Sequence, residues 1–263
     1  MIEIEKEFNV KGMISGEIMG TMKMRMHGES NKAKPYKLEN NTIFIHYDIK
    51  KKEYVMKVIE KYKPEDNKIS EEEYVALDPG IRKFQTCLRK KEAIQYGSNM
   101  SWKIGKILKK IDKNNINNNL SEKRKKGINK KNYTKITNMV DDMHWKIIND
   151  LVKKNKRVYI GKLDVKSIVA KNKLPGEELS KMTKRVCLLM KHYEFRQRLK
   201  NKCIANRVIY VEVDERFTSK TCSCCGEYNK NLGGDEVYDC GSCHKKMDRD
   251  INGCGCIFVK NLK

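Results

Sequence analysis

Four cysteines near the C-terminus form two Cys-x-x-Cys pairs, Cys222 with Cys225 and Cys240 with Cys243, separated by fourteen residues. Each pair can present two thiolates from one tight turn, and two such turns build the tetrahedral site that structural Zn²⁺ adopts. A redox-active or disulfide-bonded pair is the alternative interpretation. We expect the four cysteines to bind a structural Zn²⁺, because four thiolates leave no coordination position for water.

Acidic residues at the ends of apolar segments form a second group that could do chemistry. Asp78 follows the short apolar run 74–77, and Asp250 opens the last segment with helical character. Cleavage of a phosphodiester by two metal ions requires three or four carboxylates that converge on divalent cations about 4 Å apart. Acids at strand ends and at a helix start can meet in this way, although a single Asp such as Asp78 is more often a turn former.

Glu215 is the third candidate acid, at the end of the predicted strand 208–215. It shares its alternation with the more apolar face of this strand, formed by Ile209, Val211 and Val213. Glu212 and Asp214 alternate to the other face and are expected in solvent. A Glu on an apolar face has few structural reasons to be there, so we interpret Glu215 as a metal ligand.

The chain carries a large positive charge, +23 at pH 7, with a sequence pI near 9.5. Such an excess attracts phosphate backbones or anionic lipid, and without an amphipathic anchor or a lipidation motif nucleic acid is the better interpretation. AT-rich coding would explain the amount of lysine but not its clustering, since residues 103–135 hold twelve basic and two acidic residues. We expect contacts with nucleic acid from Lys123, Arg124, Lys125, Lys126, Arg196 and Lys200.

Ten cysteines, with no run of 18 or more apolar residues and no signal-peptide core near Met1, predict an intracellular, reducing location and no membrane span. Cytoplasm and nucleus stay open as alternatives. Cys224, Cys254 and Cys256 are surplus to the expected zinc site, and the last two are interpreted as small buried residues.

Hydrophobic periodicity predicts an α/β fold with a mixed sheet. Strands are expected at 42–47, 54–59, 74–78, 84–88, 157–161 and 208–215, with the first two and the next two as hairpins. Helices are expected over 99–155 with an Asn-rich break at 114–119, over 180–203 as one long basic helix, and from about residue 249 onward.

Several segments resemble the transposon-encoded TnpB (OrfB-type) proteins, which are RNA-guided nucleases with a RuvC-like, RNase H-fold core, related to type V CRISPR effectors and Fanzor proteins. The matching segments, within roughly residues 74–263, are Ala76-Leu-Asp78-Pro-Gly80-Ile-Arg-Lys, His192-Tyr-Glu-Phe195-Arg-Gln-Arg-Leu199, Thr218-Ser-Lys-Thr-Cys222-Ser-Cys-Cys225-Gly226, Cys240-Gly-Ser-Cys243 and Asp248-Arg-Asp250-Ile-Asn252-Gly. The resemblance implies an RNase H-like sheet with an inserted zinc ribbon, catalytic Mg²⁺, DNA and a guide RNA as partners, and Asp78 and Asp250 as the first and third RuvC acids.

The chain departs from this family at the second acid. The family motif ends a strand with Glu before a Leu, whereas the matching stretch Tyr159-Ile-Gly161-Lys-Leu163 has Gly161 at that position. The Fanzor-like branch carries a substitute Glu shortly before Thr-Ser, and that position is Glu215. We therefore expect Asp78, Glu215 and Asp250 to converge within about 8 Å, as two-metal chemistry requires; a catalytically dead site is the alternative.

Three parts are predicted: a β-rich remnant of a wedge-type domain at 1–70, a RuvC-like nuclease domain at 71–216 and 247–263, and a zinc ribbon at 217–246. Only 77 residues precede Asp78, fewer than in the family, which indicates a truncated or split copy. The expected function is a metal-dependent, RNA-guided DNA endonuclease. A nucleic-acid-binding relic and a ribosomal or transcriptional zinc-ribbon protein are the alternatives.

The Asp248-Arg249-Asp250 segment allows one further expectation. Asp248 precedes the predicted last helix by one residue, so it should cap the start of that helix and point away from the acid cluster. Arg249 should face solvent or phosphate.

Overall fold

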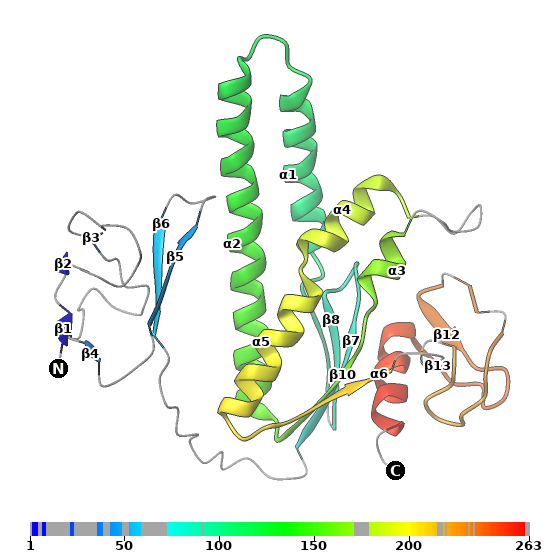
Figure 1. Ribbon diagram of the computed structural model, residues 1–263. Helices are drawn as coiled ribbons and strands as arrows, with labels where there is room; N and C mark the ends of the chain where they lie inside the picture. Colours follow the sequence, from blue (N-terminus) through cyan, green and yellow to red (C-terminus); the bar gives the residue numbers. More distant parts are fainter. Residues whose placement is uncertain are drawn as a thin grey trace. The chain divides into compact units, whose positions relative to one another are not determined.

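The structure is a computed structural model of residues 1–263 (Figure 1). It describes residues 73–90, 92–170, 179–214, 218, 220–230, 232–233 and 235–260 with their side chains. Within residues 1–72 it describes only the backbone of six short strands. Contacts within the chain define two units, Met1–Tyr62 and Lys63–Lys263.

The described part of the first unit consists of three antiparallel strand pairs. The pairs are β1 (Ile2–Ile4) with β4 (Tyr36–Leu38), β2 (Glu7–Phe8) with β3 (Met22–Lys23), and β5 (Ile43–Asp48) with β6 (Glu53–Val58). In the last pair Ile43 lies opposite Val58 and Asp48 opposite Glu53. The hairpin predicted for 42–47 and 54–59 is therefore confirmed.

A five-stranded mixed sheet forms the centre of the second unit, in the order β11-β10-β7-β8-β9. Its strands are β7 (Tyr74–Pro79), β8 (Gln85–Arg89), β9 (Ala93–Tyr96), β10 (Arg157–Gly161) and β11 (Ile209–Val213). β7, β8 and β9 are antiparallel neighbours, whereas β10 is parallel to β7 and β11 is parallel to β10. Two hairpins followed by two parallel strands reached through helical connections form the expected RNase H-like sheet.

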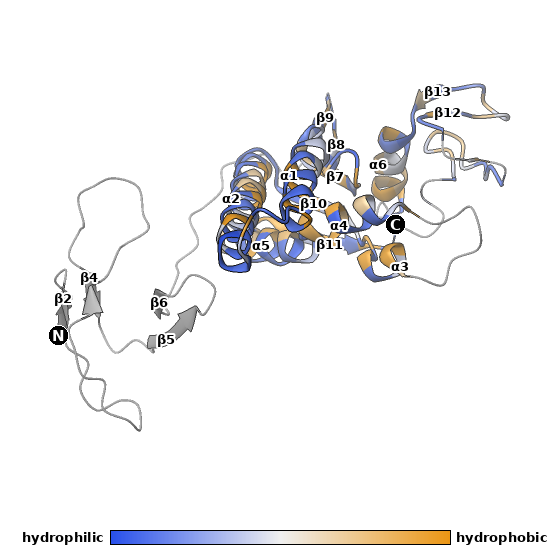
Figure 2. Ribbon diagram, turned by 90° about the horizontal axis from the view of Figure 1, so that it is seen from above, coloured by the Kyte–Doolittle hydropathy of each residue, from blue (hydrophilic) through white to orange (hydrophobic). Residues whose placement is uncertain are grey.

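Helices cover both faces of this sheet (Figures 1 and 2). One face packs on α1 (Met100–Asn115), α2 (Glu122–Lys154), α4 (Lys181–Leu189) and α5 (His192–Ala205), and its core includes Val75 and Leu77. The opposite face carries α6 (Arg249–Val259), which packs on Ala76, Tyr159 and Val213. Because successive strand residues point to opposite faces, Asp78 belongs with Ala76 on the α6 face.

The helices α1 and α2 form a long antiparallel hairpin that extends beyond the sheet (Figure 1). The predicted break is confirmed, since α1 ends at Asn115 and α2 starts at Glu122, where the Ser121 hydroxyl accepts a hydrogen bond from the Arg124 N–H. The 33 residues of α2 span about 50 Å. Neither α2 nor another helix in the described residues is long and apolar enough to cross a membrane.

The single helix predicted over 180–203 is wrong, because the structure has α4 and α5 with a break between them. Lys191 has a left-handed backbone, with φ of 54°, and precedes the first residue of α5. Met190 and His192 on either side of it are both buried. Residues two apart point to nearly opposite sides of a continuous helix, so the break allows both side chains to enter the core.

Candidate active site and thiolate site

The four predicted cysteines converge in the ribbon. Their Sγ atoms all lie within 4.8 Å of one another, with 3.7 Å between Cys222 and Cys243 and 3.6 Å between Cys225 and Cys240. A tetrahedral Zn²⁺ with Zn–S bonds of about 2.3 Å places its sulfurs about 3.8 Å apart. Both the spacing and the donor type therefore fit a closed zinc site.

Short turns and one small strand pair hold these thiolates. β12 (Val237–Asp239) pairs with β13 (Lys246–Asp248), and the second cysteine pair lies in the turn between them. Tyr238 is fully buried beside Cys222 and Cys240, and it forms the centre of the ribbon's own small core. The ribbon is thus organised around its cysteines rather than around a large apolar core.

Three further cysteines lie in or near the ribbon but outside the thiolate group. Cys224 is exposed, whereas Cys254 and Cys256 of α6 are buried, which confirms the prediction for the last two. Burial raises the pKa of Cys256 to about 11 and that of Cys254 well above its ordinary value. Both thiols therefore stay protonated and serve as small packing groups.

Asp78 and Asp250 line one cavity of about 360 Å³ at the end of β7, and Ile168 and Thr183 also line this cavity. Asp78 is the fifth of the six residues of strand β7, and Asp250 lies in the first turn of helix α6. Gly253 permits this approach, because a Cβ at that position would lie 2.5 Å from Asp78 Oδ2. The fold therefore brings together two of the three acids predicted from the sequence.

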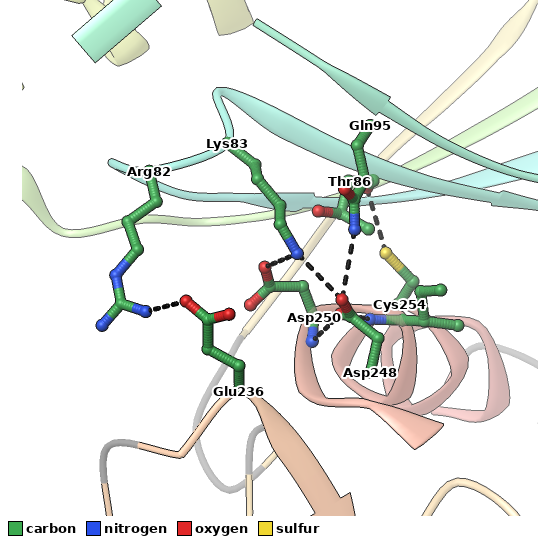
Figure 3. Close-up of polar contacts among 9 residues, drawn as sticks. Arg82, Lys83, Thr86, Gln95, Glu236, Asp248, Asp250 and Cys254 are labelled. Carbon is green, nitrogen blue, oxygen red and sulfur yellow. Dashed lines mark hydrogen bonds and ion pairs between the residues drawn. The ribbon is translucent and has the colours of Figure 1, made fainter. Parts of the chain in front are cut away.

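Lys83 pairs with two carboxylates beside this cavity (Figure 3). Its Nζ lies 2.8 Å from Asp248 Oδ2 and 3.2 Å from Asp250 Oδ2. Partial burial lowers the pKa of Lys83, but hydrogen bonds to both carboxylates outweigh it, and the pKa is raised. Sequence reasoning missed Lys83, although it ends the matched segment that begins at Ala76; no spacing rule links it to acids near the C-terminus.

Asp248 caps α6 as predicted, since its Oδ1 accepts hydrogen bonds from the N–H groups of Asp250 and Ile251 at 2.9 and 3.2 Å. It does not point away from the acids, however, because its Oδ2 shares Lys83 with Asp250. Partial burial raises the pKa of Asp248, but the hydrogen bond and charge of Lys83 together with the N–H groups of Ile251 and Asp250 outweigh it, and the pKa is lowered. Arg249, expected to face solvent or phosphate, donates to the Gly233 carbonyl at 2.6 Å and so contacts the ribbon.

Gly161 occupies the expected position of the second acid. It pairs with Val213 of β11, and the pairing of Ile160 with Leu77 places Gly161 beside Asp78 on the α6 face. Glu215 lies outside the described residues. Two residues before it, Val213 is buried against α6, and Glu212 is exposed as predicted.

The six residues expected to contact nucleic acid divide into two groups. The exposed ones are Lys123, Arg124, Lys126 and Lys200. Lys125 is buried, with its Nζ 2.9 Å from Glu122 Oε1, and Arg196 is buried and donates to the Leu163 carbonyl at 3.2 Å. These two residues therefore stabilise the protein's own fold, and the first group offers its charge at the surface.

Comparisons with known proteins agree with this architecture. Residues 192–257 match the family described as Cas12f1-like, TNB domain. The chain is 32% identical to TnpB-like protein L79 of Acanthamoeba polyphaga mimivirus, over 100% of this chain and 50% of that protein. It is 33% identical to TnpB-like protein L770 of the same virus, over 88% of this chain and 45% of that protein. The chain spans about half the length of the curated relatives it matches.

A solved structure described as "Cryo-EM structure of the Cas12f1-sgRNA-target DNA complex" has a similar fold, with a TM-score of 0.53 at 16% identity. The match covers 80% of this chain and 53% of that chain. The fold and the cysteine group thus define an RNase H-like α/β protein of the TnpB and Cas12f class. Within this class, the chain belongs to the TnpB-like family.

Proposed function

We propose that this chain is a metal-dependent, RNA-guided DNA endonuclease of a transposable element. Asp78, Glu215 and Asp250 are the proposed ligands of catalytic Mg²⁺. The observation that carries the proposal is that Asp78 and Asp250 line one cavity at the end of β7. The Cas12f1 structure of similar fold, described with sgRNA and target DNA, supports DNA and RNA as partners.

The donor groups fit a hard divalent cation. Mg²⁺ prefers carboxylate oxygens, and the Lys83 ammonium 3.2 Å from Asp250 indicates that this cavity stabilises positive charge. Bound Mg²⁺ would supply an activated water and stabilise the leaving oxygen of the phosphodiester. Asp78 on β7 and Asp250 on the capped helix α6 present their oxygens from two rigid elements, and Lys83 orients the Asp250 carboxylate.

Glu215 is the proposed substitute for the acid that Gly161 lacks. Val213 of β11 lies on the face that carries Asp78 and α6, and the sequence alternation predicts the same side for Glu215. Gly161 adds no side chain on β10, the strand between β7 and β11, so a carboxylate from beyond β11 would meet no side chain at this position.

We also propose that Cys222, Cys225, Cys240 and Cys243 hold a structural Zn²⁺. Four thiolates at this spacing leave no position for a reacting water. Metal at this site would therefore stabilise the ribbon next to α6 and take no part in the reaction.

A catalytically inactive nucleic-acid-binding protein is the second candidate function. The observation that favours it is the glycine at position 161, because this residue of β10 lies beside Asp78 in the sheet and has no carboxylate. In this case the exposed lysines of α2 would still bind phosphate, but no cluster of three acids would exist.

The distinguishing experiment incubates the chain, purified with its bound RNA, with labelled DNA in Mg²⁺ and in EDTA. We expect cleavage in Mg²⁺ that is lost in EDTA, after RNase treatment, and in Glu215→Gln. Salt-sensitive DNA binding without cleavage would support the second candidate. Equal cleavage by the wild type and Glu215→Gln would contradict the proposed third ligand.

A further inference from the structure

Asn252 connects the first cysteine turn to α6. It is completely buried, its Oδ1 accepts a hydrogen bond from the Ser223 N–H at 2.8 Å, and its Nδ2 donates to the Thr221 carbonyl at 2.7 Å. Cys222, a member of the thiolate group, lies between these two partners. One amide side chain thus holds the backbone on both sides of a thiolate.

Close packing continues along the same helix. A Cβ at Gly255 would lie 2.6 Å from Ser223 Cβ, and one at Gly253 would lie 2.5 Å from Asp78 Oδ2. The helix α6 therefore contacts the cysteine turn and the β7 carboxylate with almost no space at either place. Asp250 lies half a turn before Asn252 on this helix.

The side chain at position 252 must both accept and donate a hydrogen bond, as an amide does. A carboxylate cannot donate to the Thr221 carbonyl, and an apolar side chain would remove both hydrogen bonds, so that the Ser223 N–H loses its acceptor and the Thr221 carbonyl keeps the Cys256 thiol as a weaker donor at 3.1 Å. The arrangement is therefore sensitive to a single substitution at Asn252.

We propose that Asn252 is a positioning residue that couples the thiolate site to the acids Asp78 and Asp250. Metal at the four cysteines orders the turn around Cys222, the amide of Asn252 transmits that order to α6, and α6 places Asp250 beside Asp78. This inference rests on the proposed function of these acids. Coupling between two binding sites typically changes affinity by about 5- to 150-fold, and we expect roughly a tenfold effect here.

The test measures Mn²⁺ affinity by electron paramagnetic resonance in the zinc-loaded chain of residues 1–263. Asn252→Ala should keep its zinc, by elemental analysis, but bind Mn²⁺ roughly tenfold more weakly. Asn155→Ala is the matched control, because Asn155 is also completely buried and donates to the Leu151 carbonyl at the end of α2. Removing zinc with a chelator should weaken Mn²⁺ binding in the wild type and Asn155→Ala, with little further change in Asn252→Ala.

The outcomes separate this inference from the proposed function. Mn²⁺ binding that is absent in the wild type, or unchanged in Asp250→Asn, would overturn the metal site itself. Mn²⁺ binding that depends on Asp250 but is the same in Asn252→Ala and Asn155→Ala would overturn only the coupling. If Asn252→Ala does not fold, Asn252→Ser replaces it, and wild-type Mn²⁺ affinity in folded Asn252→Ser would overturn the inference.

Discussion

The thiolate site and the acid site of this protein are assembled in opposite ways. The four cysteines come from two turns of one short segment, and their sulfurs already lie at zinc-binding distances. The acids Asp78 and Asp250 come from the first strand of the sheet and from the last helix, and Lys83 forms an ion pair with Asp250. A local site can form as its turns form, whereas the acid site depends on correct packing of β7 against α6.

Loss of the acid site should have the largest functional effect. Asp78→Asn and Asp250→Asn keep the size of the side chain but remove the negative charge that a divalent cation needs. We expect each variant to lower the rate of Mg²⁺-dependent DNA cleavage by roughly a thousandfold or more, as for other groups that act as a unit. Nucleic-acid affinity, measured by filter binding, should change little.

Asp214→Asn is a suitable control for these variants, because Asp214 is an exposed acid next to the sheet. It should cleave like the wild type. Normal cleavage by Asp250→Asn would exclude Asp250 from the reaction.

Loss of one thiolate should destabilise the ribbon but not the sheet. We expect Cys222→Ser or Cys243→Ser to release the metal, because three thiolates do not complete the closed site. Zinc content should fall well below one per chain, and limited proteolysis should cut between Lys220 and Asp248. Cys224→Ser changes an exposed thiol between two ligands and should keep its zinc; zinc loss in this control would implicate Cys224 as a ligand.

The same contrast explains what could be predicted from the sequence. Spacing alone identified the cysteines, and strand alternation assigned Val213 to the apolar face of its strand, where the structure buries it against α6. Lys83 was missed because its partners are distant in sequence, so only the folded sheet brings them together. The break at Lys191 was missed because the surrounding residues favour a helix, and burial of both Met190 and His192 overrides that preference.

Acidic pH should destabilise the core between the sheet and the helices α1, α2, α4 and α5. His144 and His192 are buried and stack on Phe84, and burial lowers the pKa of His144 to about 4 and that of His192 to about 3. The unfolded chain gains protons on these residues near pH 6.5, before the folded protein does, so stability falls as pH drops below that value. From pH 7 to pH 5 the free energy of unfolding should fall by about 2 kcal/mol per histidine.

Urea unfolding at pH 7 and pH 5 measures this effect. His192→Phe keeps an aromatic ring beside Phe84 but cannot be protonated, so it should lose less stability between the two pH values than the wild type. An equal loss in both proteins would show that His192 does not cause the pH dependence.

The exposed basic residues of α2 should have the smallest effect. Replacing Lys123, Arg124 and Lys126 together by Ala removes up to three phosphate contacts and should reduce the slope of log affinity against log salt by at most about 2.7. Lys125→Ala is the contrasting variant, because this buried residue pairs with Glu122 and should affect stability rather than the slope. An unchanged slope in the triple variant would show that this surface does not contact nucleic acid.

Anomalous diffraction from crystals grown with Mn²⁺ and zinc tests the account most directly, because it locates each metal and Glu215 in one measurement. We predict zinc at the four cysteines and manganese in the cavity between Asp78 and Asp250, with the Glu215 carboxylate among its ligands. Manganese absent from this cavity, or Glu215 directed into solvent away from Asp78, would contradict the proposed nuclease site.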